Sequence, residues 1–297
     1  LLGAPGMRWI DVTGPDEATM LALGEKFGLH RLAIEDCLHL DQRPKLEDYG
    51  THQFLVLQGF KTDSATWKGM EMLELHFFLG PDWLITVHDP PSLSIDAAQK
   101  RVDADPRGTL GRGVDFIAYL VADALVDRNF PLLECFNDEL EELEERIFSS
   151  APSRELLREL FDLKHALVRV RRVLSPQRDV VGLLARHGIT QVSERTTVYF
   201  RDVYDHLVRI YEQLDSARDL VGSAVEAYMS QIANRTGEIS KQLTVFASIF
   251  LALSFIVGFF GQNFDGIARH EFLWPMLAAM VALPAGMLLW FRHKEWF

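Results

Sequence analysis

The chain has 297 residues, which is enough for one soluble domain of about 200 residues and a small membrane part. Its formal net charge of −12 argues against a nucleic-acid partner, because nucleic acids bind to basic surfaces. The two cysteines, Cys37 and Cys135, lie outside any CxxC pattern, so no disulfide framework is expected.

Residues 1–112 are predicted to form an α/β subdomain. Four short stretches are rich in β-branched and aromatic residues with partial alternation, which is typical of strands, and two short stretches between them have a helical pattern. A small sheet with helices on it is expected. The predicted strands are residues 8–12, 53–60, 72–79 and 83–88, and the predicted helices are residues 16–28 and 32–38.

Residues 113–195 are predicted to be a helical part of the same soluble domain. Residues 114–148 carry apolar side chains at helical spacing and many acidic ones, and residues 154–174 form a second, basic helix for which Ser153 is a plausible N-cap. An acidic helix followed by a basic one suggests an antiparallel pair with complementary charge. Alternatively, the charged residues of each helix only form a face that is exposed to solvent.

Residues 196–241 are predicted to be a long stalk helix. Apolar residues recur there every three or four positions, as in a heptad repeat, and no proline separates them from the apolar stretch that follows. An apolar stripe on a soluble helix that continues into a membrane helix is what a stalk leading to a pore would need. The predicted stripe comprises Tyr204, Leu207, Tyr211, Leu214, Val221, Val225, Tyr228 and Ile232.

Two C-terminal stretches, residues 242–264 and 272–291, contain no Asp, Glu, Lys or Arg. About 20 apolar residues in a helix cross a hydrocarbon core of about 30 Å, so each stretch is predicted to span a membrane. Residues 265–271 would be the outer loop of this hairpin. Two buried core helices are the alternative, but soluble core helices rarely run uncharged over this length twice in succession.

The distribution of basic residues predicts the orientation of the hairpin. Basic residues flank it on both ends, while the connecting loop has only Arg269, so the positive-inside rule places residues 1–241 and the tail 292–297 in the cytoplasm. Both termini would then be cytoplasmic. The flanking basic residues are Arg235, Lys241, Arg292 and Lys294.

Three segments resemble the CorA magnesium-transporter superfamily, also called the two-span GxN family. They are residues 34–50 (IEDCLHLDQRPKLEDYG), 199–222 (YFRDVYDHLVRIYEQLDSARDLVG) and 234–264, which ends in the GxN element Gly261-Gln262-Asn263. The resemblance implies a funnel-shaped homopentamer in the cell inner membrane, with an α/β cytoplasmic domain, a stalk, a pore-lining first span and an outer second span. It implies no enzyme activity and no permanently bound cofactor, with Mg²⁺ as substrate and regulator.

The pore would select a hydrated ion, because Mg²⁺ holds its water tightly and favours octahedral oxygen ligation. A ring of Asn263 carbonyl oxygens at the outer mouth could serve as the filter, with Gly261 letting the backbone leave the helix and Asp265 gathering cations. Gly261 and Asn263 are otherwise common residues at a helix C-terminus. One face below the filter would line the pore or pack against helices: Ser240, Leu243, Ala247, Leu251, Ser254 and Gly258.

The sequence departs from the family pattern at the filter, where Gln262 replaces Met of magnesium transporters or Val of the zinc branch. A transporter of Zn²⁺, Co²⁺ or Ni²⁺, with or without proton coupling, is therefore an alternative. In the family, cytoplasmic divalent ions close the pore, and Asp202 and Asp63 are the candidate carboxylates for that regulatory site. Either aspartate is otherwise a solvated charge.

Two other interpretations place the protein in a different functional class. A membrane-anchored metal sensor that does not conduct is supported only by Gln262. A membrane-tethered enzyme lacks support, because the sequence has no P-loop, GxSxG, HExxH or dinucleotide fingerprint.

Overall fold

The computed structural model describes residues 6–39, 42–61, 66–149, 151–261, 273–294 and 296. The chain divides into two compact units, Leu1–Val225 and Glu226–Phe297. The boundary falls inside the longest helix, α8 (Glu194–Phe260).

A five-stranded sheet organises the first unit, in the order β1-β5-β4-β3-β2. β1 pairs parallel to β5, and all other pairs are antiparallel. The four predicted strands are confirmed within one residue, but a short charged edge strand was not predicted, because it lacks apolar alternation and pairs with β3 through its backbone. The strands are β1 (Arg8–Thr13), β2 (Lys45–Asp48), β3 (Gln53–Lys61), β4 (Glu71–Leu79) and β5 (Trp83–His88).

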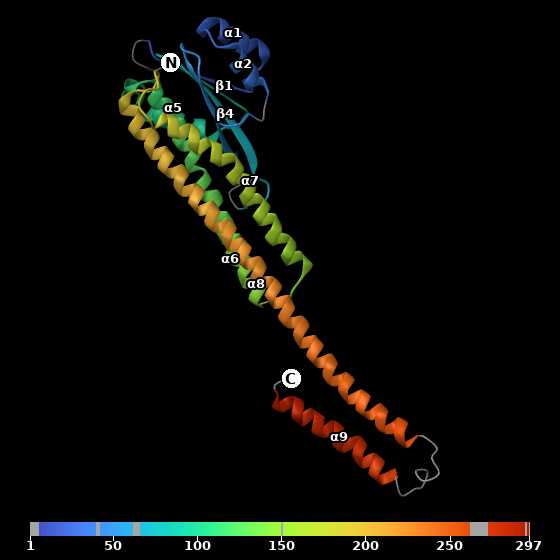
Figure 1. The fold of residues 1–297 in the computed structure, drawn as a ribbon. Coiled ribbons are helices and arrows are strands. Elements are labelled where there is room, and N and C mark those ends of the chain that lie inside the picture. The colour runs from blue at the N-terminus through green and yellow to red at the C-terminus, as the bar shows by residue number, and fades with distance from the viewer. Residues whose placement is uncertain are drawn as a thin grey trace. The chain divides into compact units, whose positions relative to one another are not determined.

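Helices cover both faces of this sheet (Figure 1). α1 (Glu17–Phe27) and α2 (Arg31–Leu38), both predicted, pack their buried residues against one face. α5 (Val114–Asp127) packs on β1, β3, β4 and β5, and α3 (Leu93–Ala104) lies beside α5. The core of the first face comprises Met20, Ala33, Ile34, Cys37, Phe54, Val56, Phe78, Ile85 and Val87.

Three small elements between β5 and α5 were not predicted: α3, α4 (Pro106–Thr109) and the 3-10 turn η1 (Leu110–Arg112). α3 begins at an N-cap, where the Ile95 amide donates to Ser92 Oγ at 3.4 Å. Its apolar residues are few and widely spaced, so the helical period is weak in this stretch.

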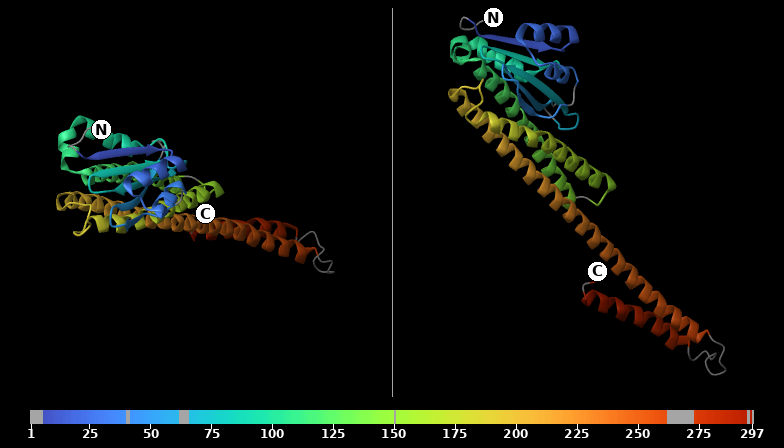
Figure 2. Two further views of the ribbon diagram at one scale, coloured as in Figure 1. Left: turned by 90° about the horizontal axis from the view of Figure 1, so that it is seen from above. Right: turned by 45° about the horizontal axis from the view of Figure 1, so that its top comes forward.

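The helical part of the first unit continues in α6 (Asn129–Ser149) and α7 (Arg154–Leu184), which run beside the first part of α8 (Figures 1 and 2). Ser153 is confirmed as the N-cap of α7, since its Oγ accepts from the Leu156 amide at 3.1 Å. The predicted end of this helix at residue 174 is wrong. α7 passes through Pro176, because buried Val180 and Leu184 stabilise the last turns despite the lost backbone hydrogen bond.

The charge pairing of these helices differs from the expected one. Among the described residues, the ion pair between α6 and α7 joins Arg146 of the acidic helix to Glu159 of the basic helix. Arg171 of α7 instead pairs with Asp215 of α8 at 2.8 Å and stacks over the Tyr211 ring. The basic face of α7 therefore serves the stalk rather than α6.

A heptad stripe on α8 holds the stalk against the other helices of the first unit. The predicted positions Leu207, Leu214, Val221 and Tyr228 are buried. The other buried positions of the repeat are Val203, Ile210, Ala217 and Ala224. Each lies one residue earlier than predicted, so Tyr204, Tyr211 and Val225 are only half-buried. The buried stripe comprises Phe200, Val203, Leu207, Ile210, Leu214, Ala217, Val221, Ala224 and Tyr228.

We expect Leu214→Ala to destabilise the first unit by about 2–5 kcal/mol, because it removes a fully buried side chain and leaves a cavity. Leu220→Ala on the same helix removes a side chain that is 48% exposed and should change the free energy of unfolding by less than about 0.5 kcal/mol. Chemical unfolding of the full chain, followed by circular dichroism, measures both. Equal losses in the two variants would contradict the packing assigned to this stripe.

In the second unit, the last part of α8 runs beside α9 (Leu273–His293) (Figures 1 and 2). Both helices are long and apolar enough to cross a membrane, and their most apolar windows are almost wholly exposed. α8 ends at Phe260, and the Gly261 amide still donates to the Val257 carbonyl at 2.8 Å.

Candidate functional site

The predicted pore face is the most open side of the last part of α8. Its six residues are all exposed. Leu243 and Leu251 are 68% and 74% exposed, which is unusual for leucine inside a folded chain. The face carries no charge from Ser240 to Gly258, so another subunit, lipid or a water-filled pore has to cover it.

The opposite side of the same helix is the covered one. Val245 and Ile256 are buried, and each lies two residues from a pore-face position, or about 200° around the helix. The hydroxyls of Thr244 and Ser248 donate to the carbonyls of Ser240 and Thr244, four residues earlier, at 2.8 and 2.7 Å. The hydrogens of these hydroxyls are thus used within the helix, which leaves only their oxygen lone pairs for other contacts.

The structure describes only some of the remaining predicted pore and regulatory residues. Gly261 stands in the turn directly after α8, as a filter at the helix end requires. Gln262, Asn263 and Asp265 lie outside the described residues, and so does Asp63. Asp202 is described and is exposed on α8.

An acid–histidine cluster, formed by Asp123 and Asp127 of α5 and His206 of α8, has the composition of a cation site. One ligand atom from each side chain lies within 4.8 Å of the others. His206 Nδ1 lies 2.9 Å from Asp127 Oδ1, and the edge of its ring meets Phe130. Arg101 Nη1 donates to Asp123 Oδ2 at 3.3 Å.

The electrostatics of this cluster favour an added positive charge. Burial raises the pKa of Asp123, and the neighbouring Asp127 carboxylate raises it further, against the opposing effect of Arg101. Asp202 lies one turn before His206 on α8, and its charge contributes to a raised pKa of Tyr119, about 12, that is caused mainly by burial. Two carboxylates, an imidazole and Asp202 thus gather where α5 meets α8.

Sequence reasoning singled out Asp202 but missed the three residues of the acid–histidine cluster. Each half carries a local pattern, with Asp123 and Asp127 four residues apart in DALVD, and Asp202 and His206 four apart in DVYDH. Residues four apart share a helix face. The meeting of the two faces is a tertiary contact that neither pattern reveals.

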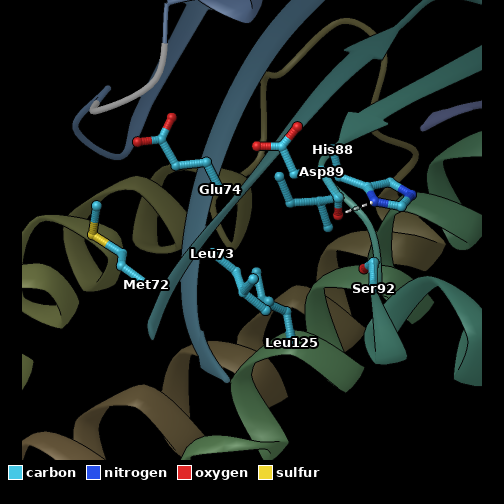
Figure 3. Close-up of a pocket in the computed structure, with 8 residues that line it drawn as sticks. Met72, Leu73, Glu74, His88, Asp89, Ser92 and Leu125 are labelled. Carbon is cyan, nitrogen blue, oxygen red and sulfur yellow. Dashed lines mark hydrogen bonds between the residues drawn. The ribbon is translucent and has the colours of Figure 1, made fainter. Parts of the chain in front are cut away.

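A separate cavity of about 310 Å³ lies where β5 ends, between β4, the start of α3 and Leu125 (Figure 3). Two of its ionisable groups have internal partners: Glu74 pairs with His76 at 3.2 Å, and His88 Nε2 lies 3.2 Å from Asp11 Oδ2. The dashed line in Figure 3 joins His88 Nδ1 to the Asp89 carbonyl at 2.9 Å. The contact between His88 and Asp11 links β5 to β1.

The pKa values of two buried histidines, His52 and His88, shift in opposite directions. Burial lowers the pKa of His52, which is fully buried. Burial also acts against protonation of His88, but hydrogen bonds to the Asp11 carboxylate and the Asp89 carbonyl outweigh it and raise the pKa of His88.

This contrast predicts the pH dependence of stability. In the unfolded chain both imidazoles titrate near pH 6.5. His52 therefore destabilises the fold as the pH falls below about 6.5, whereas His88 stabilises it there and loses this contribution as the pH rises through its higher folded pKa. We expect the unfolding temperature at pH 5, relative to that at pH 8, to rise in His52→Gln and to fall in His88→Gln. Thermal unfolding by circular dichroism measures this difference, and the same sign in both variants would contradict the assignment.

Comparison with known proteins agrees with this architecture over nearly the whole chain. The cobalt/magnesium transport protein CorA of Thermotoga maritima is 32% identical over 292 residues, covering 97% of this chain and 83% of that protein. The CorA magnesium transporter structure from Methanocaldococcus jannaschii superposes with a TM-score of 0.85 at 23% identity, covering 97% of this chain and 91% of that one. The zinc transport protein ZntB of Yersinia enterocolitica is 23% identical, covering 97% of this chain and 86% of that protein. Residues 5–293 match the family described as CorA-like Mg²⁺ transporter protein, and the chain belongs to that family of divalent-cation transporters.

Proposed function

We propose that this transporter conducts Mg²⁺ into the cell through a homopentameric pore lined by α8. The observation that carries the proposal is the uncharged, exposed face from Ser240 to Gly258, opposite the side of α8 on which Val245 and Ile256 are buried. Five copies of one helix closing around an axis would bury this face against water and one another. The family has transporters and no enzymes, which agrees with the absence of catalytic motifs in the sequence.

The filter of the proposed pore is the Gly261-Gln262-Asn263 element. Amide oxygens can hold the water shell of Mg²⁺ without stripping it, which suits an ion that dehydrates reluctantly. Asp265 would raise the local cation concentration at the outer mouth. Leu243 and Leu251 are apolar rings at which the pore could close by dewetting.

Gating is proposed to depend on cytoplasmic Mg²⁺ bound near Asp202. The acid–histidine cluster lies one turn away, so an ion there would neutralise Asp123 and Asp127 and tie α5 to the stalk. Asp63 would contribute from a neighbouring subunit. The ion is thus both cargo and regulator, and no permanently bound cofactor is required.

The proposed orientation in the inner membrane places both termini in the cytoplasm. It follows from Arg235 and Lys241 before the first span and from Arg292 and Lys294 after the second. The acidic first unit would then face the cytoplasm, where its charge attracts cations toward the pore.

Ion uptake into liposomes that hold the purified protein tests this proposal. Mg²⁺ uptake that ignores an imposed pH gradient supports a passive Mg²⁺ channel. Zn²⁺ uptake that needs the gradient would instead support a coupled carrier, an alternative that Gln262 leaves open and that the similarity to the zinc transport protein ZntB supports. Absence of flux for either ion would favour a non-conducting sensor.

A further inference from the structure

A cavity of about 520 Å³ opens where α5 and α8 begin, away from the acid–histidine cluster. Its walls come from three elements that are distant in the sequence: η1 supplies Arg112, α5 supplies Phe116, and α8 supplies Arg195, Val198 and Tyr199. A volume between about 300 and 1,000 Å³ is typical of small-molecule sites. The cavity lies wholly within the first unit.

Arg112 is fixed in this cavity before any ligand arrives. The centre of its guanidinium lies 4.6 Å from the Phe116 ring centroid and 5.8 Å from that of Tyr199. Its Nη1 donates to the Tyr199 hydroxyl at 2.8 Å. This bond uses one of the five N–H donors of the Arg112 guanidinium. The other N–H groups can bind a ligand at little further cost in side-chain entropy, because the side chain is already held in place.

Arg195 supplies a second guanidinium one helical turn before Tyr199. It is exposed, and within the described part of the chain it forms no hydrogen bond or ion pair. Of the nearby acidic residues, Glu194 is exposed and precedes Arg195 in the chain. Asp115 is engaged elsewhere, since it accepts from the Ser193 amide at 2.9 Å and from the Ser193 hydroxyl at 2.7 Å. None of the described residues that line the cavity is acidic.

Arg112 and Arg195 line the same cavity, and within the described part of the chain neither pairs with a carboxylate. Arg146 and Arg171, by contrast, each have a carboxylate partner. Planar guanidinium groups bind phosphate through paired N–H donors, which a single ammonium cannot reproduce. Phe116 and the exposed Val198 add apolar wall beside the charges, as an organic molecule would need.

We propose that this cavity is a binding site for a small soluble phosphate compound, whose phosphate group is held between Arg112 and Arg195. The apolar side formed by Phe116 and Val198 would contact the organic part of that compound. The site is independent of the pore, because none of its residues belongs to the predicted filter, the pore face or the gating cluster.

Titration of the full-length protein in detergent with pyrophosphate, followed by ³¹P line broadening, tests the proposal. We expect saturable binding that weakens about tenfold or more in Arg195→Gln, which removes an exposed side chain without a structural partner. Arg209→Gln is the matched control, since Arg209 is exposed on the same helix and the variant loses the same charge. Arg112→Lys keeps the charge but loses the planar fork, and it should weaken binding in the same way.

Three results would overturn the proposal: no saturable binding by the unmodified protein, an equal loss in Arg209→Gln, or full binding in both Arg195→Gln and Arg112→Lys. Succinate is the competitor that separates phosphate from carboxylate recognition. Displacement of pyrophosphate by an equal concentration of succinate would show that the site does not prefer phosphate and would refute that assignment. Unchanged unfolding temperatures of the variants show that any loss of binding is not a loss of fold.

Discussion

Replacing Asn263 by alanine is expected to reduce Mg²⁺ uptake into liposomes about 5- to 150-fold. In the proposed pentamer the variant would remove a ring of amide oxygens, and the loss of such polar contacts costs about 1–3 kcal/mol, which corresponds to that range of rate or affinity. The hydrated ion would then meet apolar methyl groups at the narrowest outer point. The measurement is initial uptake rate, normalised to the amount of inserted protein.

Asn234→Ala is the matched control for this variant. Asn234 is an exposed asparagine on the same helix, before the first span, and its removal should leave uptake unchanged. Uptake in Asn263→Ala equal to that of the unmodified protein would refute the filter. Equal decreases in the two variants would show that the helix, rather than the amide ring, had been damaged.

The second large effect is expected in the regulation of the pore. Asp123→Asn combined with Asp202→Asn should raise the internal Mg²⁺ concentration for half-inhibition about 5- to 150-fold. The reason is that the coupling free energy between a regulatory site and a second site is typically about 1–3 kcal/mol. The variant removes two negative charges where α5 meets α8, so the bound ion loses its attraction. Currents recorded in planar bilayers at increasing internal Mg²⁺ measure the change.

The fold should survive these substitutions. Arg101, the ion-pair partner of Asp123, is 55% exposed in its side chain and can be solvated when the carboxylate is lost. Glu212→Gln, which removes one exposed carboxylate from the same stalk, controls for the loss of a stalk charge away from the cluster. Inhibition that stays the same in the double variant, or shifts equally in Glu212→Gln, would contradict a regulatory site at this place.

The parts of the fold that sequence predicts well have long, repeated patterns. The last part of α8 and α9 follow from uncharged runs, and the strands β3, β4 and β5 follow from dense apolar residues and turn residues between them. β2 carries three charged residues among four, so its pairing with β3 depends on a backbone edge that leaves no apolar pattern. α7 passes Pro176 because buried packing outweighs the local preference to stop.

The candidate sites were predictable to different degrees, because a site made of adjacent residues leaves a pattern in the sequence and a site made of distant residues does not. Gly261-Gln262-Asn263 is contiguous, so a resemblance locates it. Asp123 and His206 are separated in the sequence by the whole of α6 and α7 and by the first turns of α8, and only the packing of α5 on the stalk brings them together. The heptad positions were half correct, because the large rings of Tyr204 and Tyr211 also fit an apolar stripe and stand directly beside the buried Val203 and Ile210.

The parallel pairing of β1 with β5 has a consequence for how the protein is made. Arg8 pairs with Trp83, so the sheet cannot close until the ribosome has delivered its fifth strand, although β2, β3 and β4 can form their antiparallel meander earlier. Both candidate spans follow the whole first unit in the chain. Since domains fold as units from the N-terminus during synthesis, the α/β unit can mature before the insertion machinery receives the first apolar segment.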